Sequence, residues 1–240
     1  MSYFQGLLVP GGSDVRISER PFQVLVRAHQ GSTSYFKCGG SIVHPQWILT
    51  AAHCVGKEHS CPYSTRITIL AGTTRLNPNR RDPGYEERTV SKIHLQPKLD
   101  GRPHLCDGGS GGKKKSMSLC FSLEQSGFSF QVVTRLSNKH VSSIIDLALL
   151  RLDRALHMTN KIKKIRIGYK QRLDTHTWIT ISGWGKTEFE DSPDHLKKAE
   201  LKLTRYSRDG GIMELTSPDG KKSACSGDSG GRMLIFQLKK

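Results

Sequence analysis

One serine near the end of the chain stands in a setting that suits a nucleophile. Ser229 lies in the pentapeptide Gly227–Gly231, which contains three glycines and one aspartate. Glycine lets the backbone turn sharply, so that backbone N–H groups can face a developing oxyanion. The same pentapeptide also fits the G-x-S-x-G turn of α/β-hydrolases, or a tight turn without chemistry. The choice depends on which base and acid accompany the serine, and in which order.

A histidine and an aspartate could complete the chemistry. His53 follows the mostly apolar segment 47–52, and a neutral imidazole can take a proton from a serine hydroxyl and return it to a leaving amine. Asp146 lies inside the apolar run 144–150, where a buried carboxylate is costly unless it is paired, as it is when it orients an imidazole. The plainer alternatives are a core histidine and a strand-end aspartate that faces solvent.

The order of these residues excludes two protease or hydrolase types. An α/β-hydrolase needs a histidine after its serine, and none follows Ser229. A subtilisin-type order needs an aspartate before the histidine, and only Asp14, which has no supporting motif, precedes His53.

With the order His53, Asp146, Ser229, the chain resembles the chymotrypsin/trypsin-like serine proteases. The resemblance covers about residues 9–98 and 144–236, and it rests on four motifs: Leu49–Cys54, Asp146–Leu150, Gly183–Gly185 and Cys225–Gly231. It implies an all-β fold of two Greek-key barrels. It also implies a serine endopeptidase that hydrolyses peptide bonds through an acyl-enzyme, without a cofactor.

The resemblance assigns a role to each residue of the triad. His53 would be the general base, Asp146 the orienting acid and Ser229 the nucleophile. The backbone N–H groups of Gly227 and Ser229 would form the oxyanion hole.

Further residues take roles only through this resemblance. Ser223 would lie at the base of the primary specificity pocket, where a serine favours aromatic or large apolar substrate side chains over Arg or Lys. Asp228 would be the partner of a freed N-terminal amino group, and Cys38 would form a disulfide with Cys54.

We expect one protease domain over residues 9–240, with a first barrel at about 9–155 and a second at about 156–240. Residues 101–143 include a glycine-rich linker followed by three lysines, which indicates a surface insertion. Only residues 230–240 follow Ser229, whereas the resemblance implies further strands and a helix. We therefore expect a truncated second barrel that folds poorly and turns over peptides slowly.

Short alternating or apolar runs between turn residues predict strands throughout the chain. The lysine-rich run Lys161–Ile167 fits a strand with a basic outer face. The other predicted strands are Phe22–Val26, Arg66–Leu70, Phe128–Val133, Thr177–Ser182, Ala199–Leu203 and Met233–Leu238.

Composition leaves two alternative functions open. The formal net charge of +16 favours loose association with polyanions, so the chain could be a polyanion-binding protein on a protease scaffold, although a solvated basic surface is the simpler interpretation. A non-catalytic protease homologue is the other alternative, and the intact triad argues against it. Peptide or protein substrates and protease inhibitors are the expected partners.

The remaining patterns bear on location and metals. No apolar run approaches 18 residues, so no membrane span is expected. The cysteines favour an extracellular setting, although the N-terminus shows no evident signal peptide. Zinc-type side chains occur at His53, Cys54, His59 and Cys61, but their spacing matches no standard finger and we expect no metal.

Overall fold

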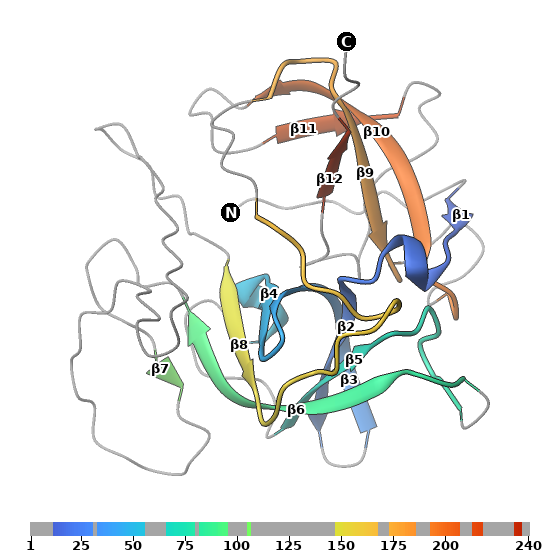
Figure 1. The fold of residues 1–240 in the computed structure, drawn as a ribbon. Coiled ribbons are helices and arrows are strands. Elements are labelled where there is room, and N and C mark those ends of the chain that lie inside the picture. Colours follow the sequence, from blue (N-terminus) through green and yellow to red (C-terminus); the bar gives the residue numbers. More distant parts are fainter. Residues whose placement is uncertain are drawn as a thin grey trace.

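The protein was analysed as a computed structural model that describes residues 12–30, 33–55, 66–79, 82–95, 105–106, 147–167, 173–185, 193–206, 213–217 and 233–236. These residues form two antiparallel sheets and two short 3-10 helices (Figure 1). The first sheet contains β2 (Gln23–Gln30), β3 (Thr33–His44), β4 (Trp47–Thr50), β5 (Arg66–Ala71), β6 (Glu86–Leu95), β7 (Leu105–Cys106) and β8 (Ala148–Leu152). The second contains β1 (Ser13–Asp14), β9 (Trp178–Gly183), β10 (Lys197–Tyr206), β11 (Met213–Thr216) and β12 (Met233–Phe236). The helices are η1 (Ile17–Glu19) and η2 (Ala52–Cys54).

The first sheet closes into a barrel. Its strands follow the order β5-β2-β3-β4-β8-β6, and β6 pairs back onto β5. The short β7 pairs with the end of β6, at Ile93 and His94. The residues of β8 alternate across the barrel wall: Leu150 faces the core, whereas Leu149 packs outside against Val43 and Trp47. The predicted all-β class is confirmed, because the described residues contain no helix longer than a single 3-10 turn.

The barrel interior requires a glycine at one position of β3. A Cβ on Gly40 would lie 2.9 Å from Ile48 Cγ2, 3.0 Å from Val24 Cγ2 and 3.1 Å from Val26 Cγ2. All three neighbours are buried branched side chains, which cannot move far inside a close-packed core. Gly40 therefore allows side chains of β2 and β4 to pack closely against the backbone of β3.

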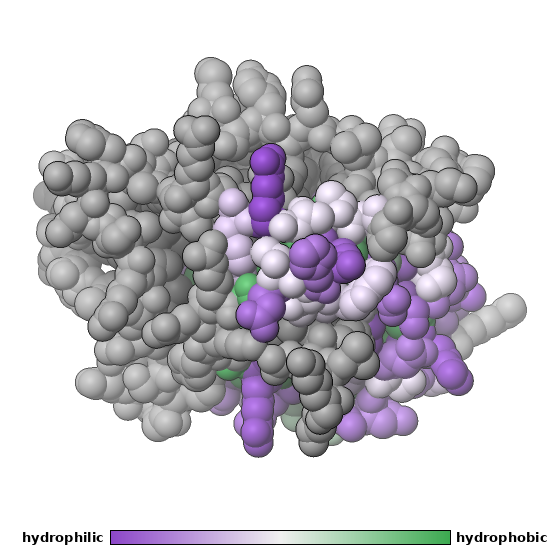
Figure 2. All heavy atoms as spheres, turned by 90° about the horizontal axis from the view of Figure 1, so that it is seen from above, coloured by the Kyte–Doolittle hydropathy of each residue, from purple (hydrophilic) through white to green (hydrophobic). Residues whose placement is uncertain are grey.

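The second sheet follows the order β1-β10-β9-β12, with β11 paired to β10, and within the described residues it remains an open path. Leu173, Ile179 and Leu203 form its core. The long, curved β10 dominates this sheet in Figure 1. Figure 2, which views the molecule from above, shows mainly hydrophilic and neutral side chains among the described residues of this face.

The two sheets are joined by packing and by a partly buried hydrogen bond. Leu25 and Leu70 of the barrel pack with Trp184 and Leu196 from the second half of the chain. The Trp184 indole Nε1 donates to the Thr74 carbonyl oxygen at 2.6 Å. These contacts cross between residues that the sequence analysis assigned to different barrels.

The predicted strand at Lys161–Ile167 is wrong. This segment forms no strand ladder. The Lys163 N–H donates to the Pro21 carbonyl oxygen and the Ile165 N–H donates to the Ile42 carbonyl oxygen, each at 2.8 Å, whereas the backbone N–H groups of Lys161 and Ile162 donate to the Thr159 hydroxyl. Its alternating pattern arises because Ile162 is buried while Lys163 and Lys164 are exposed, in a connection that runs over the barrel rather than in a ladder.

The other predicted strands that fall on described residues overlap observed ones. Phe128–Val133 lies outside the described residues, as does most of the expected insertion 101–143. The described part of that segment, Leu105–Cys106, forms β7 and pairs with Ile93 and His94 of β6.

Candidate active site

The turn that carries His53 is fixed by a hydrogen bond before it and by a disulfide after it. Strand β4 ends at Thr50, and the chain turns through Ala51 into η2 (Ala52–Cys54). The Thr50 hydroxyl donates to the Gly39 carbonyl oxygen at 2.8 Å in a buried site. The backbone around His53 is therefore fixed, while its side chain lies outside the described atoms.

A disulfide anchors the same turn. Cys54 is bonded to Cys38 of β3, with the two Cα atoms 6.0 Å apart, and both side chains are buried. This is the pairing that the resemblance implied. It closes a loop with a sequence separation of 16 and joins the residue after His53 to the neighbouring strand.

Asp146 lies outside the described residues, and strand β8 (Ala148–Leu152) begins shortly after it. Ala148, the first residue of β8, pairs with Thr50 of β4 on one side and with Leu95 of β6 on the other. Strands β4 and β8 are antiparallel, so the chain leaves β4 and enters β8 at the same edge of the barrel.

The predicted serine motif also lies outside the described residues. Ser223, Gly227, Asp228 and Ser229 precede β12, whose first residue, Met233, pairs with Ile181 of β9. Strand β9 ends at Gly183 and continues to Trp184, which is hydrogen-bonded to the first barrel. In Figure 1, β12 begins at the end of the second sheet that faces the barrel. The structure thus describes β4, β8 and β12, the strands next in the sequence to the three predicted motifs.

Electrostatic contacts fix the chain just before η1. Asp14 of β1 forms an ion pair with Lys197 of β10 at 2.7 Å, and this hydrogen bond holds the pKa of the Asp14 carboxyl below its usual value. Lys198 similarly contacts Glu19 at 3.4 Å and lowers the pKa of that carboxyl. The N-terminal part of the described chain is therefore tied to the second sheet.

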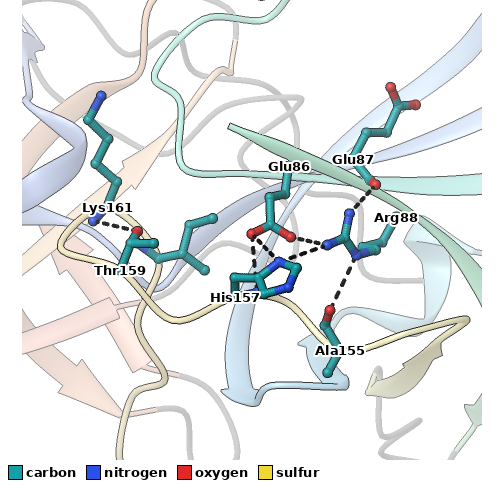
Figure 3. Close-up of polar contacts among 8 residues, drawn as sticks. Glu86, Glu87, Arg88, Ala155, His157, Thr159 and Lys161 are labelled. Atoms are coloured by element: carbon teal, nitrogen blue, oxygen red, sulfur yellow. Dashed lines mark hydrogen bonds and ion pairs between the residues drawn. The ribbon is translucent and has the colours of Figure 1, made fainter. Parts of the chain in front are cut away.

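The sequence analysis missed a polar cluster at the opposite edge of the barrel (Figure 3). Glu86 accepts from the buried guanidinium of Arg88, and its Oε1 lies 3.1 Å from both the backbone nitrogen and Nδ1 of His157. Arg88 Nε also donates to the Ala155 carbonyl oxygen at 3.3 Å. The cluster fastens the segment that leaves β8 onto β6. Alternating charges in a strand ordinarily indicate a solvated face, so the sequence carried no signal for it.

A second missed pair lies between the sheets. The Ser182 hydroxyl donates to Gln23 Oε1 at 3.2 Å, and both side chains are buried. A hydrogen bond between the first and second halves of the chain restricts how the two sheets can shift, because separating them would leave both groups buried and unpaired.

Two negative findings concern the described residues. They contain no group of three His, Cys, Asp or Glu side chains that could hold a metal ion, and His59 and Cys61 lie outside them. None of their helices has the length and apolarity needed to cross a membrane.

The chain matches the family model described as Trypsin over residues 9–110 and 120–235. It belongs to the trypsin family. Trypsin-1 of Astacus astacus is 27% identical over 236 residues, which is 93% of this chain and 81% of that protein. Kallikrein-7 of Homo sapiens is 26% identical, and the match covers 96% of this chain and 73% of that protein. These relatives support a protease function at the level of the family.

Two further matches are to a longer serine protease and to a solved structure. Serine protease grass of Drosophila melanogaster is 26% identical over 93% of this chain, and the match spans only 54% of that protein's length. The atomic-resolution structure of HBP is 16% identical, with a TM-score of 0.64 over 95% of this chain and 80% of that chain. At this identity the likeness concerns the trypsin-type fold alone.

Proposed function

We propose that the chain is a serine endopeptidase that uses His53, Asp146 and Ser229 as its triad. Family membership and the order of the three motifs support the assignment. His53 would take the proton of the Ser229 hydroxyl as that oxygen attacks the substrate carbonyl carbon, and Asp146 would stabilise the imidazolium. The N–H groups of Gly227 and Ser229 would bind the oxyanion. His53 would then protonate the leaving amine, and water would hydrolyse the acyl-enzyme.

The observation that carries this proposal is the register at Ala148. His53 follows Thr50 by three residues, and Asp146 precedes Ala148 by two. Because Thr50 and Ala148 are paired, both motifs join the barrel at one edge. Short chain segments from paired positions can bring an imidazole and a carboxylate into hydrogen-bond reach. The disulfide at Cys54 supports the same arrangement, because it limits the positions open to His53.

A covalent probe tests the triad directly. The parent chain should be labelled by a fluorophosphonate, and Ser229→Ala and His53→Ala should each lose nearly all labelling and peptide hydrolysis, because the residues act as a unit. Ser226→Ala, three residues upstream in the same glycine-rich segment, is the matched control and should keep both. Equal labelling of Ser229→Ala and the parent chain would refute the assignment. Absence of labelling in a folded parent chain would favour a non-catalytic homologue.

We also propose a preference for Phe, Tyr or Leu before the cleaved bond. The support is Ser223, which stands six residues before the nucleophile and supplies no carboxylate for an Arg or Lys side chain. Profiling with a peptide library should return large apolar residues at this position. Ser223→Asp should shift the preference toward Arg and Lys, and a parent chain that already prefers them would contradict the proposal.

We further propose that the protein acts outside the cell, with proteins or peptides as substrates and protease inhibitors as partners. The buried Cys38–Cys54 disulfide supports this location, since such bonds persist in oxidising compartments. Detection of the intact disulfide in protein recovered from the medium of expressing cells tests it.

A further inference from the structure

A row of four side chains, of which Trp47 is buried and the other three are basic, crosses the outer face of the barrel. Arg151 is the exposed residue of β8, and it pairs with Lys92 of β6 on one side and with Trp47 of β4 on the other. Trp47 pairs in turn with His44 of β3. Directly opposed residues of antiparallel strands project from the same face about 5 Å apart. We call His44, Trp47, Arg151 and Lys92 the outer row; it spans four adjacent strands (Figure 1).

The outer row places two cations directly opposite each other. Like charges at opposed positions of a sheet repel and destabilise the pairing. Within the part of the chain that the structure describes, no carboxylate forms an ion pair with Lys92 or Arg151. An anion placed over both side chains would remove this repulsion.

Positive charge continues at the other end of the row. The Ile165 N–H donates to the Ile42 carbonyl oxygen at 2.8 Å, which places the exposed Lys164 beside β3. Burial lowers the pKa of His44, and the Lys164 ammonium lowers it further. The cations thus extend from β6 to the segment that covers β3, a distance of roughly 15 Å at about 4.8 Å per strand.

We propose that the outer row, together with Lys164, binds a linear sulfated polysaccharide. A polymer with sulfate groups along its length can contact Lys92 and Arg151 at one end and Lys164 at the other, whereas one small anion cannot. The net charge of +16 draws polyanions to the whole surface, and the row supplies a place where cations converge. The disulfide-bonded barrel suits an extracellular setting, where such polysaccharides occur.

The aromatic residues favour a polysaccharide over a single-stranded nucleic acid. Proteins that bind single strands stack the bases on exposed aromatic rings. Trp47 is only 7% exposed, and its ring packs on His94 with the centroids 5.3 Å apart. Trp178, the described aromatic residue that is 39% exposed, belongs to β9 of the other sheet. The outer row therefore offers charge without a stacking surface.

Binding to heparin tests the proposal with two variants of equal charge. Lys92→Gln/Arg151→Gln removes the opposed pair, and Lys202→Gln/Arg205→Gln removes two cations from β10 of the other sheet. Each double substitution lowers the formal charge of +16 by the same amount. We expect the first to weaken the heparin Kd at physiological salt by about fivefold or more and to reduce the slope of log Kd against log salt, and the second to change the Kd by less than about twofold.

The readout does not depend on peptide hydrolysis, so the proposal can fail or hold independently of the triad. The thermal unfolding temperature of Lys92→Gln/Arg151→Gln should equal or exceed that of the parent, because the repulsion is relieved, so weaker binding would not reflect unfolding. Equal losses in the two double variants would refute a local site and leave only net charge. Competition by single-stranded DNA as effective as that by heparin would refute the polysaccharide assignment, as would no measurable heparin binding by the parent.

Discussion

Removal of the Cys38–Cys54 disulfide should destabilise the barrel and loosen the turn that carries His53. Cys38→Ala/Cys54→Ala opens a loop with a sequence separation of 16. The chain-entropy relation gives about 3 kcal/mol at 25 °C for a loop of that length. Both side chains are buried, so truncating two sulfur atoms adds a packing loss in the same direction.

Thermal unfolding under oxidising conditions measures this effect. At about 2–4 °C per kcal/mol for a chain of this size, the double variant should unfold about 6–12 °C below the parent. Reductant should lower the unfolding temperature of the parent. It should lower the unfolding temperature of the double variant by less, because the Cys38–Cys54 bond is already absent. If the proposed triad operates, fluorophosphonate labelling should fall at a temperature where the double variant is still folded. An unfolding temperature within about 2 °C of the parent would show that other contacts hold the turn, and the reasoning would be wrong.

Three further predictions test the packing, the polar cluster and the titration of the barrel. Gly40→Ala should destabilise by about 1–3 kcal/mol, because its Cβ would meet Ile48 Cγ2 at 2.9 Å; an unchanged unfolding midpoint in urea would contradict this. Glu86→Gln should cost about 2 kcal/mol by leaving the buried Arg88 guanidinium without its carboxylate, whereas Glu87→Gln, an exposed neighbour whose backbone carbonyl alone contacts Arg88, should change the unfolding free energy by less than about 0.5 kcal/mol. Burial is the main cause that lowers the pKa of both His29 and His44, so their neutral forms stabilise the folded state above the unfolded value of about 6.5, and stability should fall as the pH drops below it. His29→Asn/His44→Asn should flatten the unfolding temperature between about pH 7.5 and 5.5, and an unchanged slope would count against these two side chains.

The sequence predicted the strands best where one face is buried. In β10 the buried residues Ala199, Leu201 and Leu203 alternate with more exposed ones, so the period-2 pattern is strong. The same rule failed at Lys161–Ile167, because an alternating pattern reports only which side chains are buried. A strand also needs a neighbouring ladder, and here the backbone N–H groups of Lys163 and Ile165 donate instead to two isolated carbonyl oxygens, those of Pro21 and Ile42.

The contacts between distant residues could not be predicted from local patterns. Glu86 and His157 lie far apart in the chain and meet only because β6 and β8 become neighbours in the closed barrel. Ser182 and Gln23 meet only because the two sheets pack together. In both cases the side chains are of polar types that usually face solvent, and nothing nearby in the sequence indicates their distant partners.

For the candidate site, the resemblance supplied the residues and the barrel supplies the reason that two of the motifs converge. The motif after β4 and the motif before β8 are separated by residues 55–145, yet Thr50 and Ala148 are directly paired. No local pattern in the sequence fixes that register. It follows from barrel closure, in which the buried residues of β8 must face the same core as those of β4.

The same register bears on the long segment between β6 and β8. Leu95, the last residue of β6, is paired with Ala148, the first residue of β8, so β6 ends and β8 begins at neighbouring positions of the barrel. The entropy cost of closing such a loop rises only slowly, by about 0.6 kcal/mol for each doubling of its length. The direction in which the chain enters β8 is set by Thr50 on one side and Leu95 on the other, not by the length of the loop. A segment inserted here should therefore weaken the barrel little and leave the start of β8 in place.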